Sequence, residues 1–432
     1  MSQHASGPQE HERLASATVR AQHAPPYERG GPAPIVHLGV GAFARAHLGV
    51  YADGLLRSGH GALVHGVSLR SPHAEAQLGP QDGLYSLTER ERQGDAAPLV
   101  LGAFGAVGTG PDVAIEAIAA PSTTMVTLTV TEKGYGIDEA PSVLAAGLSA
   151  RDRSLPAPVV ASLDNLADNG VLLRRRVLAA AERIDVGLAR WIEHEVRFPS
   201  SVVDRMVPAT TPADLDLVAV RLGLRDEGAV VAERHCSWTI ERVQGLPPLD
   251  TVGVELVDDV GPHQRRKLWL LNLPHSAFAY AGLLAGCDTI AQATEHPDVA
   301  PFVAALVEDV LEVCEVPGAR DFAEDALRRF GNPSLGHTCV QVAADGSEKL
   351  PQRLLPVVAA RRAQGRGTAR GALVVAMWSA AVTGAPLGGR TLPAVQDRAS
   401  TLIDVDPEFD AEVAAARRAL EGHGLAALAA VS

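Results

Sequence analysis

The sequence predicts an α/β domain built on a parallel sheet, followed by a mostly α-helical domain. Between residues 33 and 255, short apolar runs alternate with stretches of helical periodicity, which is the pattern of a parallel sheet covered by helices. From about residue 258 the predicted strands stop, and Ala- and Leu-rich helical patterns dominate to the end. A chain of 432 residues is also too long for one compact core. We therefore expect a flexible tail at 1–30, an α/β domain at 31–257 and a helical domain at 258–432.

Composition narrows the class of protein. Residues 1–30 lack the apolar core of a signal peptide, and no run of eighteen apolar residues occurs, so we expect no membrane-spanning segment. A net charge of −13 argues against a nucleic-acid or anionic-membrane partner. The four cysteines have no C-x-x-C spacing, which favours reduced thiols in a cytoplasmic protein over a disulfide framework or a metal site: Cys236, Cys287, Cys314 and Cys339.

The first predicted strand runs directly into a glycine turn. The apolar run at 33–38 is followed by Gly39-Val40-Gly41-Ala42-Phe43-Ala44 and then by helical periodicity at 45–56. Strand, G-x-G-x-x-A turn and helix in this order are typical of a Rossmann-type dinucleotide-binding domain, in which the turn and the helix N-terminus receive the pyrophosphate. The candidate cofactor-binding residues of this turn are Gly39, Gly41, Ala42 and Phe43.

Further strands are expected at 62–69 and 124–130, as a doubly wound sheet requires. The second of the three expected strands lacks the acid that normally binds the adenosine ribose, because it runs into Leu69-Arg70-Ser71-Pro72. Arg70 could bind a 2′-phosphate instead, or it could be a solvated loop residue. These residues leave the choice between NAD and NADP open; NAD is the cofactor that we expect, with NADP as the second possibility.

The segment Lys267-Leu-Trp-Leu-Leu-Asn272-Leu-Pro-His275 can place an amine, an amide and an imidazole on one helix face. At about 100° per residue, Asn272 lies roughly 140° and His275 roughly 80° around the axis from Lys267. A lysine in apolar surroundings is shifted towards its neutral form and can accept a hydroxyl proton, while the amide and imidazole can bind the same oxygen. The alternative is that three polar residues only interrupt an apolar helix.

Several motifs appear in a characteristic order between residues 35 and 356. They are IVHLGVGAFARAH (35–47), GVSLRSP (66–72), PQDGLYSL (80–87), TLTVTEKGY (127–135), SLDNLADNG (162–170), FPSSVVDRMVPATT (198–211), KLWLLNLPHS (267–276) and NPSLGHTCVQVAADGSEKLPQRLLP (332–356). Together they resemble the mannitol dehydrogenase family of polyol-specific long-chain dehydrogenases, which includes fructuronate reductases, also called mannonate oxidoreductases.

The resemblance implies roles for individual residues. It makes Lys267 the general base, aligns Asn272 and His275 with family positions, and implies that Asn165 helps hold the reacting oxygen and that Asp204 contacts substrate. Asn165 could instead be a turn or cap residue, and Asp204 could only pair with Arg205. Glu132 and Lys133 in the TLTVTEKGY motif are further cofactor-binding candidates. An anionic substrate would need local positive charge, for which His337, Lys349 and Arg353 are the candidates.

The chain departs from the family pattern at three places. Gln264 stands where a glutamate is usual, and Gly336-His337 replaces an expected substrate-binding arginine. Pro274 stands between Asn272 and His275. Because proline removes one helical hydrogen bond and collides with the preceding turn, it predicts a kink or break near residue 274.

These observations predict a metal-independent, NAD(P)-dependent oxidoreductase that interconverts a secondary alcohol and a ketone of an open-chain sugar acid or polyol. We expect its active site in a cleft between the two domains. The sequence at 346–353 favours D-mannonate and D-fructuronate as substrates. The alternatives are a mannitol 2-dehydrogenase or another polyol dehydrogenase (mannitol/fructose or arabinitol/xylulose), a catalytically silent nucleotide-binding sensor, and a zinc alcohol dehydrogenase. A monomer or small homo-oligomer is expected.

Overall fold

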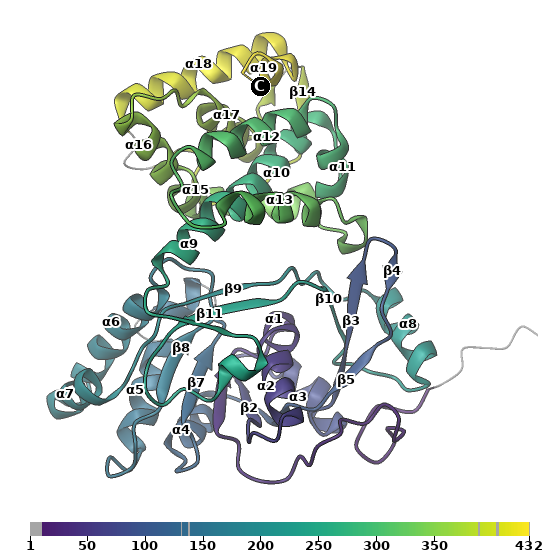
Figure 1. Ribbon diagram of the computed structural model, residues 1–432, viewed down its shortest axis with the longest axis vertical. Helices are drawn as coiled ribbons and strands as arrows, with labels where there is room; N and C mark the ends of the chain where they lie inside the picture. The colour runs from purple at the N-terminus through teal and green to yellow at the C-terminus, as the bar shows by residue number, and fades with distance from the viewer. Residues whose placement is uncertain (1–10, 131, 137–138, 388, 403–405, 432) are drawn as a thin grey trace, which may run out of the picture. The chain divides into compact units, whose positions relative to one another are not determined.

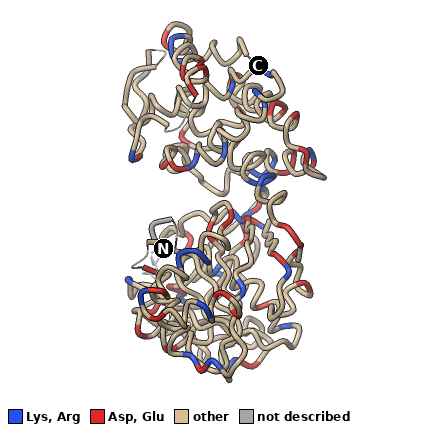
Figure 2. Tube along the Cα trace, turned by 90° about the vertical axis from the view of Figure 1, so that its left-hand side faces the viewer, with Lys and Arg blue, Asp and Glu red and all other residues tan. Residues whose placement is uncertain are grey.

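The computed structural model describes residues 11–130, 132–136, 139–387, 389–402 and 406–431. It divides into two compact units, Met1–Val260 and Gly261–Ser432, and each unit is described by itself. Figure 2 shows acidic and basic residues interspersed along the described trace of each unit. None of the described helices combines the length and the apolar character that crossing a bilayer requires.

The first unit contains the predicted parallel sheet (Figure 1). Its five strands are all parallel and lie in the order β6 (Phe104–Thr109), β2 (Val64–Ser68), β1 (Ile35–Leu38), β7 (Met125–Leu128) and β8 (Val159–Ser162). In chain order, β2 and then β6 are added on one side of β1. Strand β7 then pairs with the other side of β1, and β8 follows it. The expected α/β fold class is confirmed, and the change of direction beside β1 is where such sheets bind ligands.

Helices cover both faces of this sheet (Figure 1). On one face, the side chains of Val36 and Leu38 pack in a core with α4 (Pro111–Ala119), α5 (Ala140–Ala150), α6 (Asn169–Glu182) and α7 (Val186–Glu195). On the other face, Ile35 packs in a core with α1 (Ala42–Ala46) and α2 (Leu48–Arg57). Side chains alternate between the faces of a strand, so continuous apolar runs such as 35–38 supply both cores.

Two smaller sheets complete the first unit. One contains β3 (Tyr85–Glu91), β4 (Gly94–Asp95), β5 (Leu99–Leu101) and β10 (Val230–Glu233); the other contains β9 (Ser201–Asp204), β11 (Ser237–Glu241) and β12 (Glu255–Val257). The remaining elements are α3 (His73–Leu78), η1 (Gly79–Gln81), η2 (Glu132–Tyr135), α8 (Pro212–Leu222) and η3 (Leu249–Val252). The sequence pattern did not separate these strands from those of the main sheet, because periodicity does not encode which strands pair.

Residues 11–30 are the described part of the tail expected at 1–30, and they contact the rest of the first unit. Leu14 is fully buried, and its backbone N–H donates to the carbonyl of Arg225. The guanidinium of Arg29 donates to the carbonyls of Gly102 and Phe104 at 2.8 and 2.9 Å. A polar, proline-containing segment is therefore held by backbone pairing and one arginine, which composition alone did not reveal.

His37 is a buried histidine that anchors the glycine turn. Its Nδ1 lies 2.8 Å from Thr127 Oγ1 on β7, and its Nε2 lies 3.0 Å from Thr129 Oγ1 and 3.1 Å from the carbonyl of Gly39. Burial lowers the pKa of His37 from 6.5 to about 4, so the ring is neutral near pH 7. The turn that follows β1 is thereby tied to the neighbouring strand.

This histidine predicts a loss of stability in mild acid. In the unfolded chain the ring binds a proton near pH 6.5, whereas in the folded unit it does so only near pH 4. Its contribution is therefore fully present above pH 6.5 and decreases by roughly 3 kcal/mol as the pH falls to 4. Urea unfolding followed by tryptophan fluorescence should show this slope in the wild type and a weaker slope in His37→Gln. His194→Gln, at an exposed histidine, should keep the wild-type slope.

The second unit is mostly helical, as predicted. Helix α10 (Leu273–Ala285) is buried along nearly its whole length, and α11, α12, α14 and α17 pack around it. The other helices are α9 (Gly261–Lys267), η4 (Leu268–Asn272), α11 (Ile290–Glu295), α12 (Val299–Leu311), α13 (Ala319–Phe330), η5 (Pro333–Leu335), α14 (Cys339–Ala343), α15 (Gly346–Arg353), α16 (Leu355–Ala363), α17 (Ala369–Thr383), α18 (Pro407–His423) and α19 (Ala426–Ala429).

Two details of this unit differ from expectation. The Ala- and Leu-rich pattern at 407–428, which predicts a single helix, forms two helices that Gly424 separates, α18 and α19. Strands do not stop at residue 258, because β13 (Pro386–Leu387) pairs with β14 (Arg390–Thr391). Two-residue strands are too short to produce an alternating pattern, so the sequence did not predict them.

Candidate active site

The glycine turn after β1 has the geometry that close approach of a ligand requires. Gly39 has a φ of 100°, and a Cβ atom at this position would lie 2.1 Å from the carbonyl oxygen of Thr129. Only glycine fits there. Gly41 precedes α1, and a Cβ atom there would meet nothing within 4 Å. Ala42 and Phe43 open α1, so their backbone N–H groups lie at its N-terminal end, and Ala44 is fully buried where the helix packs.

Arg70 lies two residues beyond β2 and forms an ion pair with Glu139, the residue that precedes α5. Its side chain is 69% exposed, so the pair faces solvent. Glu132 and Lys133 belong to η2 in the chain after β7, but their side chains lie outside the described part of the structure. Their expected contact with a cofactor stays a prediction.

Asn165 and Asp204 belong to the first unit. Asn165 is exposed in the loop after β8. The residue before it, Asp164, accepts hydrogen bonds from Val130 N at 3.1 Å and from Tyr135 Oη at 2.9 Å. Asp204 is buried at the end of β9, with one carboxylate oxygen 3.4 Å from His235 Nε2. Both lie where strands end, and their roles towards substrate stay predictions.

In the second unit, the predicted interruption of the helix near Pro274 is confirmed, in the form of a π-helical segment. Helix α9 ends at Lys267, the π segment covers Leu268–Asn272, and α10 begins one residue before Pro274. The N–H of Leu273 bonds to the carbonyl of Leu268, five residues back. The predicted angles assumed one straight helix from Lys267 to His275, and that assumption is wrong. The wider π turn changes the direction of Lys267 relative to His275.

Three polar side chains lie in or beside the π segment: Lys267 before it, Asn272 at its end and His275 in the first turn of α10. Lys267 and Asn272 are 8% and 6% exposed. Asn272 Nδ2 and His275 Nε2 are buried and have no hydrogen-bond partner among the described residues. Because a buried polar atom without a partner is costly, both atoms are suited to bind the oxygen atoms of a ligand.

His275 lies within a group of cationic side chains. Its ring stacks on Phe330 with centroids 4.6 Å apart and lies 5.9 Å from the ring of His337. Burial, and then the charges of His337, Arg353, Lys349 and Arg329, hold the pKa of His275 well below its ordinary value. We call His337, Arg353, Lys349 and Arg329 the cationic cluster; α13, α15 and the loop before α14 bring these four residues to His275 at the start of α10. The structure thus brings together His275 and three of the four predicted substrate-binding residues, His337, Lys349 and Arg353; the fourth, Asp204, belongs to the first unit.

Helix α15 supplies two members of the cationic cluster. Lys349 Nζ donates to the carbonyl of Ala344 at 2.5 Å. Arg353 donates to Ser276 Oγ at 2.9 Å and to the carbonyl of Asn272 at 3.3 Å, so its guanidinium rests on the turn that carries Asn272 and His275. Of the 38 lysines and arginines in the chain, only three are lysines, and all three are predicted site residues: Lys133, Lys267 and Lys349.

Sequence reasoning missed Asp397, which fixes the start of α15. Its carboxylate accepts hydrogen bonds from Ser347 N at 3.0 Å, Trp378 Nε1 at 2.8 Å and Arg398 N at 2.7 Å, and also from Ser347 Oγ. Arg398 pairs with Glu348 at 2.9 Å. Asp397 is 48 residues from Lys349, and no local pattern marks it, although the start of α15 depends on it.

Replacing Asp397 with asparagine should therefore weaken substrate binding more than turnover. An amide keeps one acceptor but turns an NH2 group towards donors, which leaves buried donors unpaired at a cost of roughly 1–3 kcal/mol. We expect the KM for the preferred substrate to rise about fivefold or more while kcat falls less. Steady-state kinetics of Asp397→Asn and of the milder Ser347→Ala provide the test. Equal effects on both parameters would contradict it.

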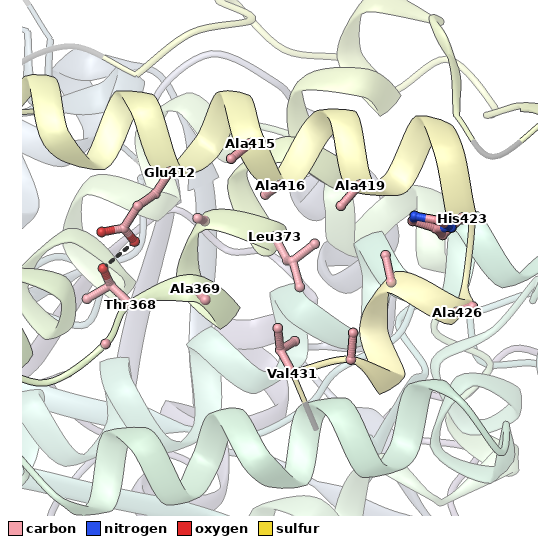
Figure 3. Close-up of a pocket in the computed structure, with 14 residues that line it drawn as sticks. Thr368, Ala369, Leu373, Glu412, Ala415, Ala416, Ala419, His423, Ala426 and Val431 are labelled. Atoms are coloured by element: carbon pink, nitrogen blue, oxygen red, sulfur yellow. Dashed lines mark hydrogen bonds between the residues drawn. The ribbon is translucent and has the colours of Figure 1, made fainter.

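A cavity of about 680 Å³ in the second unit is distinct from this site. It lies between α17, α18 and α19 and is lined mainly by alanines, with Glu412 and Thr368 hydrogen-bonded at one end and His423 at the other (Figure 3). It contains no predicted site residue. Among the described residues there is no group of three or more His, Cys, Asp or Glu side chains that could hold a metal ion. The four cysteines are free thiols.

Comparison with known proteins identifies the family. Residues 33–250 match the mannitol dehydrogenase Rossmann domain, and residues 259–420 match the mannitol dehydrogenase C-terminal domain. The chain is 34% identical to the D-mannonate oxidoreductase of Escherichia coli (strain K12) over 413 residues, which cover 87% of this chain and 85% of that protein. It is 32% identical to the mannitol 2-dehydrogenase of Aspergillus oryzae (strain ATCC 42149 / RIB 40) over 393 residues, or 80% and 78% of the two chains.

A solved structure agrees with these matches. The ternary complex of Pseudomonas fluorescens mannitol 2-dehydrogenase with NAD and D-mannitol has a TM-score of 0.86 at 28% sequence identity, covering 97% of this chain and 99% of that one. The two domain models together span most of the sequence, and the relatives are similar over most of their own length. The chain therefore belongs to the mannitol dehydrogenase family and is an oxidoreductase of the kind that acts on polyols and sugar acids.

Proposed function

We propose that this protein is a metal-independent, NAD(P)-dependent oxidoreductase that interconverts the secondary alcohol and the ketone of an open-chain sugar acid, with D-mannonate and D-fructuronate as the preferred pair. The observation that supports a sugar acid as the substrate is the cationic cluster around His275. Arginine and lysine side chains in partly buried surroundings are strong partners for a carboxylate, which a neutral polyol lacks. The similarity to a D-mannonate oxidoreductase supports the same choice.

In the proposed reaction, the neutral amine of Lys267 accepts the hydroxyl proton as the alcohol is oxidised and returns it in the reverse direction. Asn272 Nδ2 donates to the oxygen on which negative charge develops, and the neutral ring of His275 orients that oxygen or the neighbouring hydroxyl. Asn165 is a further donor to the oxygen, and Asp204 a further contact for the sugar hydroxyls. A nicotinamide dinucleotide, which the glycine turn of Gly39 and Gly41 would hold, would supply the hydride chemistry.

The first unit supplies residues that fit a dinucleotide. The Gly39 turn has no room for a Cβ atom, Gly41 leaves open space, and both lie at the carboxyl edge of the parallel sheet beside β1. NAD is the expected cofactor, as in the Pseudomonas fluorescens complex. A second candidate function, mannitol 2-dehydrogenase, is favoured by the TM-score of 0.86 to that enzyme.

A spectrophotometric screen tests the proposal. NADH and NADPH are each combined with fructuronate, tagaturonate and fructose, and the oxidised nucleotides with the matching alcohols. We expect the highest kcat/KM with fructuronate and mannonate, unchanged by a chelator. Faster turnover of fructose and mannitol would favour the polyol dehydrogenase instead. Nucleotide binding without turnover of any substrate would indicate a catalytically silent sensor.

A further inference from the structure

The structure brings an acid to the part of the dinucleotide domain where the sequence lacks one. In such domains an Asp or Glu at the carboxyl end of the second strand normally accepts hydrogen bonds from the adenosine ribose. Here β2 ends at Ser68, and Arg70 follows in that region. The guanidinium of Arg70 forms an ion pair with Glu139, which is 69 residues away in the sequence.

The topology places this ion pair beside the glycine turn. Strands β2 and β7 are the two neighbours of β1, and all three run parallel. Gly39 N donates to the carbonyl of Val67, and Thr129 N donates to the carbonyl of Leu38, so the three strands end at the same level. Arg70 lies two residues after the end of β2. Glu139 directly precedes α5, the first α-helix after β7 in the chain. The pair therefore lies at the edge of the sheet where the turn receives the nucleotide.

Both partners are accessible from solvent, as contact with a bound nucleotide requires. The side chain of Arg70 is 69% exposed and that of Glu139 is 32% exposed. The carboxylate of Glu139 can accept hydrogen bonds from the 2′- and 3′-hydroxyls of a ribose, as the usual strand-end acid does. A 2′-phosphate, in contrast, would meet a like charge, and it could bind Arg70 only by displacing Glu139.

We propose that Glu139 determines the preference for NAD over NADP, by keeping Arg70 engaged and by placing a negative charge beside the 2′ position of the adenosine ribose. This inference rests on the proposed NAD(P)-dependent function. It assigns the task of the missing strand-end acid to a residue of another loop. Arg70 then serves as the partner of that acid, and it becomes a phosphate-binding residue only when the acid is neutralised.

Direct binding measurements on the full-length protein test this assignment. The Kd values of NADH and NADPH are measured by fluorescence titration for the wild type, Glu139→Gln, Arg70→Ala and the double variant. We expect the wild type to bind NADH more tightly, and Glu139→Gln to lower the ratio of the NADPH Kd to the NADH Kd about tenfold. The double variant should lose most of this change, because the gain depends on Arg70.

A matched control uses the exposed ion pair between Arg174 and Glu193, which lies in α6 and α7 of the same unit. Glu193→Gln removes the same charge and should leave the Kd ratio within twofold. A Kd ratio that is unmoved in Glu139→Gln would overturn the inference, as would a tenfold change that persists without Arg70. If the wild type binds neither nucleotide, the proposed function itself fails. Glu139→Asp, which keeps the charge, guards against a folding defect and should retain NADH preference.

Discussion

Replacing Lys267 with alanine is expected to lower the turnover number by about 10²-fold or more, because a positioned general base typically contributes that much to catalysis. The amine is nearly buried at the end of α9, one residue before the π segment. Binding of the cofactor, which concerns the first unit, should stay near the wild-type Kd. Turnover with the preferred substrate and fluorescence titration of NADH measure the two quantities separately.

Lys267→Arg separates the proton-accepting role from a purely electrostatic one. Arginine keeps the positive charge but does not lose a proton in proteins, so this variant should be about as inactive as the alanine variant. Added primary amines should partly restore the rate of Lys267→Ala. Arg265→Ala, at an exposed position of the same helix, should keep wild-type turnover. Wild-type turnover in Lys267→Ala at pH 7 would refute the assignment of the base.

Replacing Arg353 with methionine is expected to raise the KM for a sugar-acid substrate by tenfold or more, and the KM for fructose much less. Within the cationic cluster, Arg353 is the member that also rests on the turn carrying Asn272 and Ser276. Loss of its charge removes a charge-assisted hydrogen bond to a carboxylate, which is worth roughly 1.5–3 kcal/mol. Steady-state kinetics with fructuronate and fructose give the comparison.

Two further variants identify the cause of any change. Arg353→Lys keeps the charge and should recover part of the affinity for the sugar acid, but not all, because an ammonium cannot reproduce a planar guanidinium. Arg328→Met removes a charge from the exposed surface of α13 and should leave both KM values unchanged. A similar rise in KM for fructuronate and fructose would show that Arg353 only supports the helix, and the sugar-acid proposal would lose its main support.

Much of the fold and part of the site could be predicted from the sequence because the relevant signals are local. The strand, glycine turn and helix at 33–56 occupy consecutive residues, so the dinucleotide-binding fold was readable before any strand pairing was known. Lys267, Asn272 and His275 lie within nine residues of each other. The scarcity of lysine adds a further local signal, because a chain that uses arginine almost everywhere retains lysine at 133, 267 and 349. Proton transfer is one task that arginine cannot perform.

Other features of the site became visible only with the tertiary structure. A local pattern gives the face of a helix on which a residue lies, but it does not give the partner that the face meets. Pro274 predicted an interruption, yet only packing decided that it takes the form of a π segment ending at Asn272.

What the sequence by itself determined about this protein is its fold class and its family, and it also supplied Lys267 as the candidate base, since each depends on residues that are neighbours in the chain. The tertiary structure alone decided the pairing of Arg70 with Glu139, the fixing of α15 by Asp397 and the assembly of the cationic cluster from separate helices and a loop. These contacts join residues 50 to 78 positions apart. Their formation depends on how whole elements pack, and no periodicity within one element encodes that.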